Sequence, residues 1–379
     1  MAELPSEIMY DILSRMPVKY LARFRCVSKL WLHYINDSHL KTMHAKRSPV
    51  DDPMLIMFHQ IPSKHPNSPC RLSLLEHEGS CTLKVRKKPP LMGLMCKSFV
   101  YRYPDDIILG SCNGLPYSSK GHHDGIHGNM LVVIHPLSRE CYELPPINIS
   151  LTHPQQTWGI SCDDESYRLR VEESFGLGFD ESTDTFKMVS VVLREEVKQD
   201  LCTMVHVLGT DSRWKIDQVP SYPIAGEGVF ANGCLHWLNN DEDDDEYPIY
   251  LGRPVIRFDM ANEEFGLIHP PQERPSGWIK ELLVDLHGEV GYVYHMVNRG
   301  IEVWALKERG WVMHCEFRQK PPLPKGFVKV LGFWNENGDV LMTDSWKPMF
   351  VYNLKSDNLD EVSFAEVRLS VGMEITFSR

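Results

Sequence analysis

The chain has 379 residues, of which 42% are hydrophobic and 24% charged, and such a composition is ordinary for a protein that buries a full core. The net charge is −11, but residues 1–50 carry eight Lys/Arg against four acids, so this opening segment stands at +4 and the remainder at −15. The acidic remainder excludes general binding to nucleic acid, which needs a basic face.

The same composition argues against membrane and metal roles. There is no run of about 18 apolar residues for a membrane span, and residues 1–20 lack the apolar region of a secretory leader. The ten cysteines include no C-x-x-C pair and no zinc spacing. We therefore expect free thiols in a reducing compartment, cytoplasmic and/or nuclear, with no membrane contact, no metal and no cofactor.

Three short helices are predicted over residues 4–35. Leu4-Pro5-Ser6-Glu7 indicates a helix start, because proline is tolerated in the first turn. Ile8, Ile12 and Leu13 give that helix an apolar face, and Pro17 ends it near Arg15. Apolar residues at helical spacing then predict a second and a third helix: Val18, Leu21 and Phe24; Val27, Leu30, Trp31, Tyr34 and Ile35.

This helical segment is too small to stand alone. Units below roughly 40 residues rarely stabilise themselves without disulfides, a metal or a partner. Two interpretations follow from the pattern: a helical cap packed on the next domain, or a separate module that docks on a partner.

After about residue 50 the helical periodicity gives way to short β-rich runs between clusters of Gly, Asn, Asp and Pro, which predicts an all-β domain. The predicted strands include 54–58, 130–134, 186–193, 255–258, 291–295 and 349–352.

The β-rich part also repeats itself weakly. Each unit has a glycine turn, a hydrophobic strand and a second strand that ends in a polar turn. The marker glycines are Gly114, Gly178, Gly233, Gly288 and Gly338, at intervals of 64, 55, 55 and 50 residues.

A period near 50 is typical of kelch-like propeller blades of four antiparallel strands. Residues 51–379 have room for about six blades, of which five are visible as repeats. Strands near Met54–His59 and Leu72–Leu75, joined by the C-terminal segment Ala365–Phe377, would complete the sixth. The alternative is one or two β-sandwiches, which repeat less regularly.

The opening residues "LPSEIMYDILSRMPVKYLARFRCVSKLW" (4–31) resemble an F-box of the plant type. The resemblance implies a three-helix module at residues 1–46 that docks on a Skp-family adaptor, itself held on a cullin within an SCF ubiquitin ligase. It also implies a set of residues that divide between adaptor binding and packing of the F-box: Leu4, Pro5, Ile8, Ile12, Leu13, Pro17, Leu21, Phe24, Val27 and Trp31.

The motifs "SCNGL" (111–115), "FGLGFDESTDTFK" (175–187), "NGCLHWL" (232–238) and "FDMANEEF" (258–265) are similar to the F-box-associated domain of plant F-box proteins. The similarity covers most of residues 105–355. It implies that residues 51–379 form a kelch-like β-propeller that binds a protein substrate, whose identity stays unknown. The chain departs from the pattern at Pro116, at His135 and in the acidic insertion Asp241–Glu246.

Several residue clusters admit a second interpretation. "GHHDGIHG" (121–128) is either an exposed loop or a metal site, and "NNDEDDDEYP" (239–248) is a solvated loop or a surface that attracts a basic partner. The recurrent tryptophans pack between blades or form ligand cages; they are Trp214, Trp237, Trp304, Trp311, Trp334 and Trp346.

No catalytic motif is present: there is no G-x-S-x-G, no Walker loop and no G-x-G-x-x-G after a strand. We therefore predict a mainly β protein with a small helical module, acting as a non-catalytic substrate adaptor of a ubiquitin ligase. The loops around 116–129 and 239–248 are the candidate substrate contacts. The alternatives are a ligase-independent scaffold, or a catalytic propeller acting on glycans.

Overall fold

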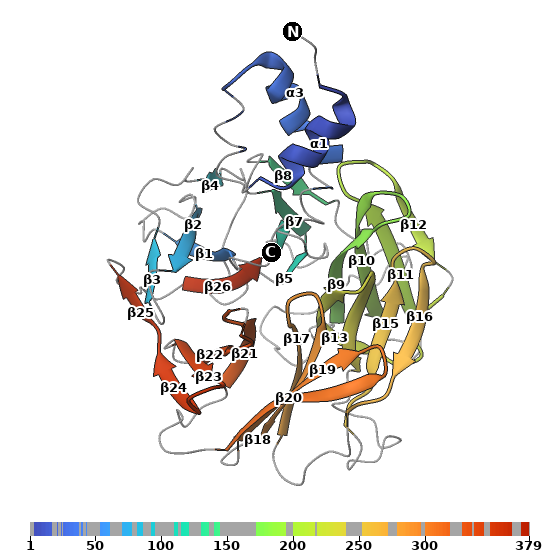
Figure 1. Ribbon diagram of the computed structural model, residues 1–379. Coiled ribbons are helices and arrows are strands. Elements are labelled where there is room, and N and C mark those ends of the chain that lie inside the picture. The colour runs from blue at the N-terminus through green and yellow to red at the C-terminus, as the bar shows by residue number, and fades with distance from the viewer. Residues whose placement is uncertain are drawn as a thin grey trace, which may run out of the picture.

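The structure of the chain is a computed structural model. The residues it describes are 4–16, 21, 24, 26–37, 39–40, 43, 54–60, 70–77, 82–85, 92–94, 110–112, 115–120, 130–135, 140–144, 172–194, 200–216, 218–239, 252–271, 279–296, 300–318, 328–335, 337–344, 349–365 and 373–378. The fold of this part of the chain is mainly β (Figure 1).

Two helices are described in full at the N-terminal end: α1 (Ser6–Ser14) and α3 (Lys29–Asn36). Most of the second predicted helix lies outside the described residues, although Leu21 and Phe24 are helical. The third helix was predicted to include Val27 and instead begins at Lys29. The reason is local, because the Ser28 side chain caps the helix by accepting the Trp31 N–H at 3.1 Å, which leaves Val27 in the preceding turn.

The described strands form five sheets. The first contains β1 (Met54–Gln60), β2 (Cys70–His77), β3 (Thr82–Val85), β4 (Met92–Leu94), β25 (Ser363–Ala365) and β26 (Met373–Ser378). The second contains β5 (Gly110–Cys112), β6 (Leu115–Lys120), β7 (Met130–His135) and β8 (Glu140–Glu143).

The third sheet has eight strands: β9 (Glu172–Asp180), β10 (Thr185–Arg194), β11 (Asp200–Val207), β12 (Arg213–Ile216), β13 (Ile224–Ala231), β14 (Cys234–Asn239), β15 (Val255–Asp259) and β16 (Glu264–Ile268). The fourth contains β17 (Ile279–Asp285), β18 (Val290–Met296), β19 (Gly300–Lys307) and β20 (Gly310–Arg318). The fifth contains β21 (Val328–Phe333), β22 (Val340–Asp344), β23 (Met349–Asn353) and β24 (Asn358–Glu361).

The eight-stranded sheet is two antiparallel four-stranded units joined along one edge. β9 and β13 meet there as a parallel pair, in which Glu227 lies opposite Phe175. Within each unit the strands follow one another in chain order, as antiparallel meanders do. The repeat predicted from the sequence is therefore a repeat of four-stranded meanders.

One of the repeat markers was wrong. Gly233, Gly288 and Gly338 have φ of +72°, +84° and +80° and lie between the first and second strands of their units, where a tight turn needs this backbone. Gly178 lies inside β9, opposite Lys187. The equivalent turn of that unit is Glu181–Asp184, where Asp184 takes the positive φ of 57°. The interval from Asp184 to Gly233 is 49 residues, where the marker Gly178 gave 55, and Gly114 lies outside the described residues.

The C-terminal strand joins the N-terminal sheet, as the sequence predicted for closure. β26 pairs antiparallel with β1, with Met57 opposite Ile375, and β25 pairs with β3. The first strands of the successive units also contact one another in a cycle: β5 with β9, β9 with β13, β13 with β17, β17 with β21, β21 with β26, and β26 with β5. Figure 1 shows the sheets following one another around the molecule in this order, which is a propeller-like fold.

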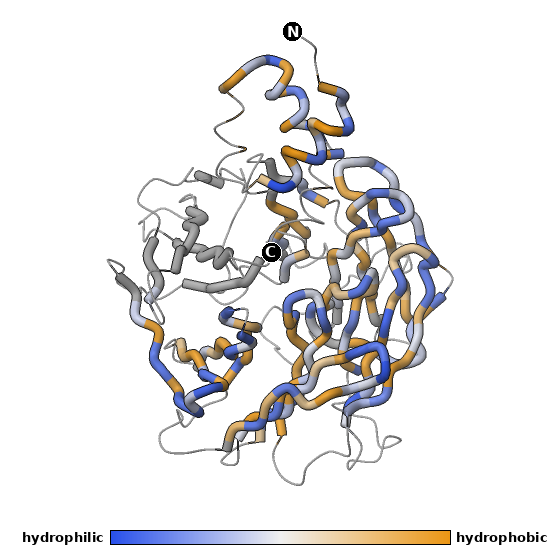
Figure 2. Tube along the Cα trace, viewed as in Figure 1, coloured by the Kyte–Doolittle hydropathy of each residue, from blue (hydrophilic) through white to orange (hydrophobic). Residues whose placement is uncertain are grey.

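The buried cores lie between neighbouring units. Tyr117 and Val133 of one unit pack with Phe175 and Leu177 of the next. The same holds further along the chain, where Leu238 and Val255 pack with Tyr292 and Tyr294. Hydrophobic stretches, orange in Figure 2, recur along the strands of the sheets that are coloured there. The units from β5 to β24 thus bury apolar faces against their neighbours, which a propeller achieves and an isolated meander does not.

Candidate functional site

The helical module has a small core of its own. Four residues are buried there: Met9, Leu13, Leu21 and Leu40. Phe24 and Trp31 pack against them and meet each other edge to face, with their ring centroids 5.2 Å apart. Among the predicted F-box residues, Leu13, Leu21, Phe24 and Trp31 therefore lie on the packing side of the module.

A second group of the predicted residues faces outward. Leu4, Ile8 and Ile12 are 55%, 46% and 43% exposed. Ile8 and Ile12 are four residues apart and lie along one side of α1, and Leu4 lies just before the helix. Pro5 is also exposed and begins the helix, since its carbonyl oxygen accepts the N–H groups of Ile8 and Met9, both at 3.1 Å. We call Leu4, Pro5, Ile8 and Ile12 the docking stripe.

Further apolar residues are exposed near the start of α3. Val27 is 59% exposed, and Leu30 and Leu32 are also exposed. Pro17 lies outside the described residues. An apolar surface of this kind, on a module too small to bury it, marks an interaction site. Figure 2 shows hydrophobic residues on both helices at this end of the molecule.

A polar contact joins the two helices. Tyr10 of α1 donates its hydroxyl hydrogen to Asp37, the residue that ends α3, and the Asp37 carboxylate also accepts the His39 N–H at 3.0 Å. The bond to Asp37 is the main reason that the pKa of Tyr10 is raised to about 12. The same bond, followed by the His39 N–H, lowers the pKa of Asp37. We call Tyr10 and Asp37 the tyrosine latch.

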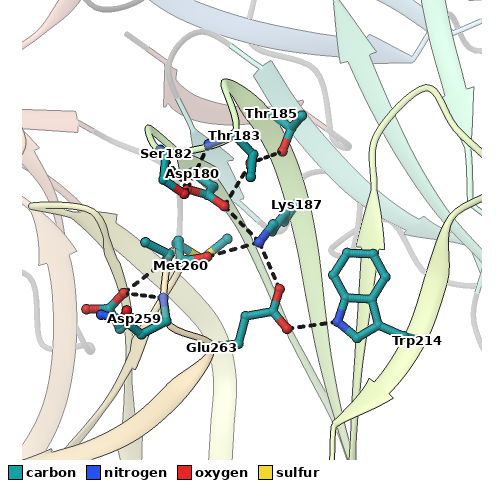
Figure 3. Close-up of polar contacts among 11 residues, drawn as sticks. Asp180, Ser182, Thr183, Thr185, Lys187, Trp214, Asp259, Met260 and Glu263 are labelled. Atoms are coloured by element: carbon teal, nitrogen blue, oxygen red, sulfur yellow. Dashed lines mark hydrogen bonds and ion pairs between the residues drawn. The ribbon is translucent and has the colours of Figure 1, made fainter.

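A buried ionic cluster, which sequence reasoning missed, lies in the propeller (Figure 3). Lys187 Nζ is 2.8 Å from Asp180 Oδ2, 2.8 Å from Glu263 Oε1 and 3.1 Å from the carbonyl oxygen of Met260. Trp214 Nε1 donates to Glu263 Oε2 at 2.8 Å. We call Asp180, Lys187, Trp214 and Glu263 the ionic clasp.

The clasp is fully satisfied. The three N–H groups of an ammonium meet three acceptors at Lys187. Burial alone would raise the pKa of Asp180, but hydrogen bonds from Lys187, Ser182 and Thr183 outweigh it and lower that pKa. Burial would likewise lower the pKa of Lys187, but Asp180 and Glu263 raise it. Both shifts keep Asp180 and Lys187 in their charged forms, which suits a structural role better than proton transfer. In the sequence, only the stretch "FDESTDTFK" brings members of the clasp, Asp180 and Lys187, close together. Glu263, which binds Lys187, lies 76 residues further along the chain.

Two of the alternative sites cannot be placed. The histidine-rich segment 121–128 and the acidic run 241–246 lie outside the described residues. Within the described part of the chain, no group of three His, Cys, Asp or Glu side chains could hold a metal ion. No helix there is long and apolar enough to cross a membrane.

The tryptophans lie in packing positions wherever they are described. Trp237 and Trp334 are buried, and Trp214, Trp304 and Trp311 pack against the cores between units. Trp346 lies outside the described residues. The packing interpretation thus holds for the five that are described.

Comparison with known proteins matches both parts of the chain. Residues 1–43 match the family model of the F-box domain, and residues 101–375 match that of the F-box associated beta propeller domain. F-box protein CPR1 of Arabidopsis thaliana is 25% identical over 407 residues, which cover 100% of this chain and 88% of that protein. An F-box/kelch-repeat protein of the same plant is 24% identical over 368 residues, covering 92% of this chain and 87% of that protein.

Among solved structures, the fucose-specific lectin of Aleuria aurantia is 9% identical. The match covers 79% of this chain and 92% of the lectin with a TM-score of 0.39. A likeness this distant adds nothing to the argument on ligand or function.

Proposed function

This chain belongs to the plant F-box proteins that carry an F-box associated β-propeller domain, and from that premise we propose that it is a substrate-recognition adaptor of an SCF-type cullin ubiquitin ligase. In this proposal the F-box, residues 1–46, docks on a Skp-family adaptor bound to a cullin. The propeller, residues 51–379, holds a protein substrate. The observation that carries the proposal is the exposed docking stripe on a module that packs other apolar residues, among them Leu13 and Leu21, inside.

The proposal also says which F-box residues contact the adaptor and which pack inside the module. We assign adaptor contact to the docking stripe and to Val27, because these residues are exposed. Leu13, Leu21, Phe24 and Trp31 pack the module instead. Exposed apolar residues contribute to affinity by leaving water when the partner binds.

The protein performs no bond chemistry in this proposal. It acts by proximity, raising the effective concentration of a substrate lysine near a charged ubiquitin-conjugating enzyme. Its place of work is the cytoplasm and/or the nucleus, which agrees with the unpaired thiols of Cys112, Cys202, Cys234 and Cys315.

We also propose that the propeller has six blades. The cycle of contacts from β5 through β26 supports this number, because each of its six strands lies at one end of the strand order of a different unit. Five of these units have four strands, and the sheet that contains β26 has six. The unit led by β26 takes its other strands from the N-terminal end, β1 to β3.

A binding experiment tests the adaptor role. The full-length chain and the double variant Leu4→Ala/Pro5→Ala are compared for capture of a Skp-family adaptor, alone and with its cullin. Removing two residues of the docking stripe should weaken capture about tenfold or more, as the loss of interface anchors does. The matched control is Val312→Ala/Met313→Ala, which removes two equally exposed apolar side chains from β20.

The control variant should bind as the wild type does. Equal capture by the wild type and by Leu4→Ala/Pro5→Ala would remove the docking stripe from the interface. Adaptor capture without cullin or ubiquitin transfer would favour a ligase-independent scaffold. No capture by the folded wild-type chain would overturn the proposed function.

A further inference from the structure

The tyrosine latch joins two helices that are distant in sequence. Tyr10 lies in the middle of α1 and Asp37 ends α3, 27 residues later. The Tyr10 ring also meets Tyr34 edge to face, with centroids 5.0 Å apart, and His39 with centroids 4.9 Å apart. One side chain of α1 thus contacts three residues in or just after the last turn of α3.

The helices also share an apolar core. Four buried residues, Met9, Leu13, Leu21 and Leu40, form the centre of the module. Hydrophobic contact is non-directional, so a core this small restrains the rotation of a nine-residue helix weakly. A hydrogen bond has a preferred direction, and the latch adds that constraint.

The position of Tyr10 on α1 couples the latch to the direction in which Ile8 and Ile12 face. Successive residues of a helix are rotated by about 100°, so Tyr10 lies roughly 200° around the axis from Ile8. The docking stripe and the latch are therefore on opposite sides of α1. Any rotation of α1 that breaks the latch therefore also changes the direction in which Ile8 and Ile12 face relative to α3.

We propose that Tyr10 and Asp37 are positioning residues for adaptor docking: their hydrogen bond sets the rotation of α1 against α3 and so fixes the direction in which the docking stripe faces. This inference rests on the proposed function, since it takes the docking stripe as the adaptor contact. The latch itself need not touch the adaptor.

The test is a titration of the full-length chain with purified Skp-family adaptor. Tyr10→Phe removes the hydroxyl group and keeps the ring that packs on Tyr34 and His39. We expect the dissociation constant to rise about five- to tenfold at a temperature where circular dichroism shows wild type and variant to be equally folded. The matched control is Tyr34→Phe, which removes a hydroxyl group from the neighbouring ring and should leave the constant unchanged.

Variants of Asp37 separate positioning from general stability. Asp37→Asn keeps one oxygen that accepts the Tyr10 hydroxyl hydrogen and gives up the bond from the His39 N–H, so its affinity should stay closer to that of the wild type than the affinity of Tyr10→Phe does. Asp37→Leu should reproduce the loss seen with Tyr10→Phe. The double variant Tyr10→Phe/Asp37→Leu should bind no worse than either single variant, because both remove the same bond.

The outcomes distinguish this inference from the proposed function. If the wild type binds and Tyr10→Phe binds equally well, the latch has no positioning role and the adaptor role stands. If Tyr10→Phe lowers the melting temperature but leaves the dissociation constant of the folded chain unchanged, the latch is structural only. If the wild type does not bind, both proposals are overturned.

Discussion

At the scale of single residues, the ionic clasp yields the sharpest prediction. Lys187→Met removes the cation and leaves the buried carboxylate of Asp180 and the partly buried carboxylate of Glu263 beside an apolar chain. Removing one partner of a buried pair costs about 3–5 kcal/mol, because the remaining charge has lost its compensation. We expect this decrease in the free energy of unfolding, measured by urea titration at neutral pH.

The control for that variant is an exposed pair. Lys307 forms an ion pair with Glu289 on the surface, and both side chains are largely accessible. Lys307→Met should change the free energy of unfolding by about 1 kcal/mol at most, because solvent screens exposed pairs. If Lys187→Met and Lys307→Met lowered the free energy of unfolding equally, the ionic clasp would contribute no more to stability than an exposed ion pair.

Sequence reasoning reached residues whose neighbours are near in the chain and missed those whose partners are far away. The helical spacing of Ile8, Ile12 and Leu13 was enough to predict α1, because a helix is local. Which of these apolar residues faces inward was not predictable, since Leu13 meets Leu40 only after the module has folded. Lys187 and Glu263 show the same limit, because β10 of one unit and the turn between β15 and β16 of the next bring them together.

At the scale of elements, the inner strands depend on small residues beside a large ring. Trp237 of β14 is fully buried and donates its Nε1–H to the Phe175 carbonyl oxygen of β9 at 3.2 Å. A Cβ added at Gly228 of β13 would lie 2.7 Å from this indole. Gly228→Ala should therefore lower the free energy of unfolding by about 1–3 kcal/mol through overpacking, measured by urea titration.

The matched control is Gly266 of β16, where an added Cβ would lie 3.6 Å from its nearest neighbour, in ordinary contact. Gly266→Ala should be tolerated, with a change within about 0.5 kcal/mol. If Gly228→Ala were equally harmless, the indole would have room to move and the strands around it would be less tightly packed than described. The strands themselves were predictable from apolar runs, but the approach of β13 to Trp237 was not, because glycine leaves no hydrophobic signal.

At the scale of the whole molecule, closure depends on the last strand of the chain. β26 pairs with β1 and contacts both β5 and β21, so it lies where the beginning and the end of the propeller meet. A chain that stops at residue 365 lacks β26 and keeps β25. Its first sheet loses its innermost strand, and β5 and β21 lose their common neighbour.

We expect this truncation to lower the free energy of unfolding by several kcal/mol or to abolish cooperative unfolding, because exposed sheet edges and faces remain. Urea titration and limited proteolysis measure the effect. Adaptor capture by the F-box should persist, because the core of that module contains no propeller residue. Cooperative unfolding at the wild-type midpoint would show that the ring does not need β26. The ring is complete only when the last residues are present, whereas the docking stripe lies among the first to be synthesised.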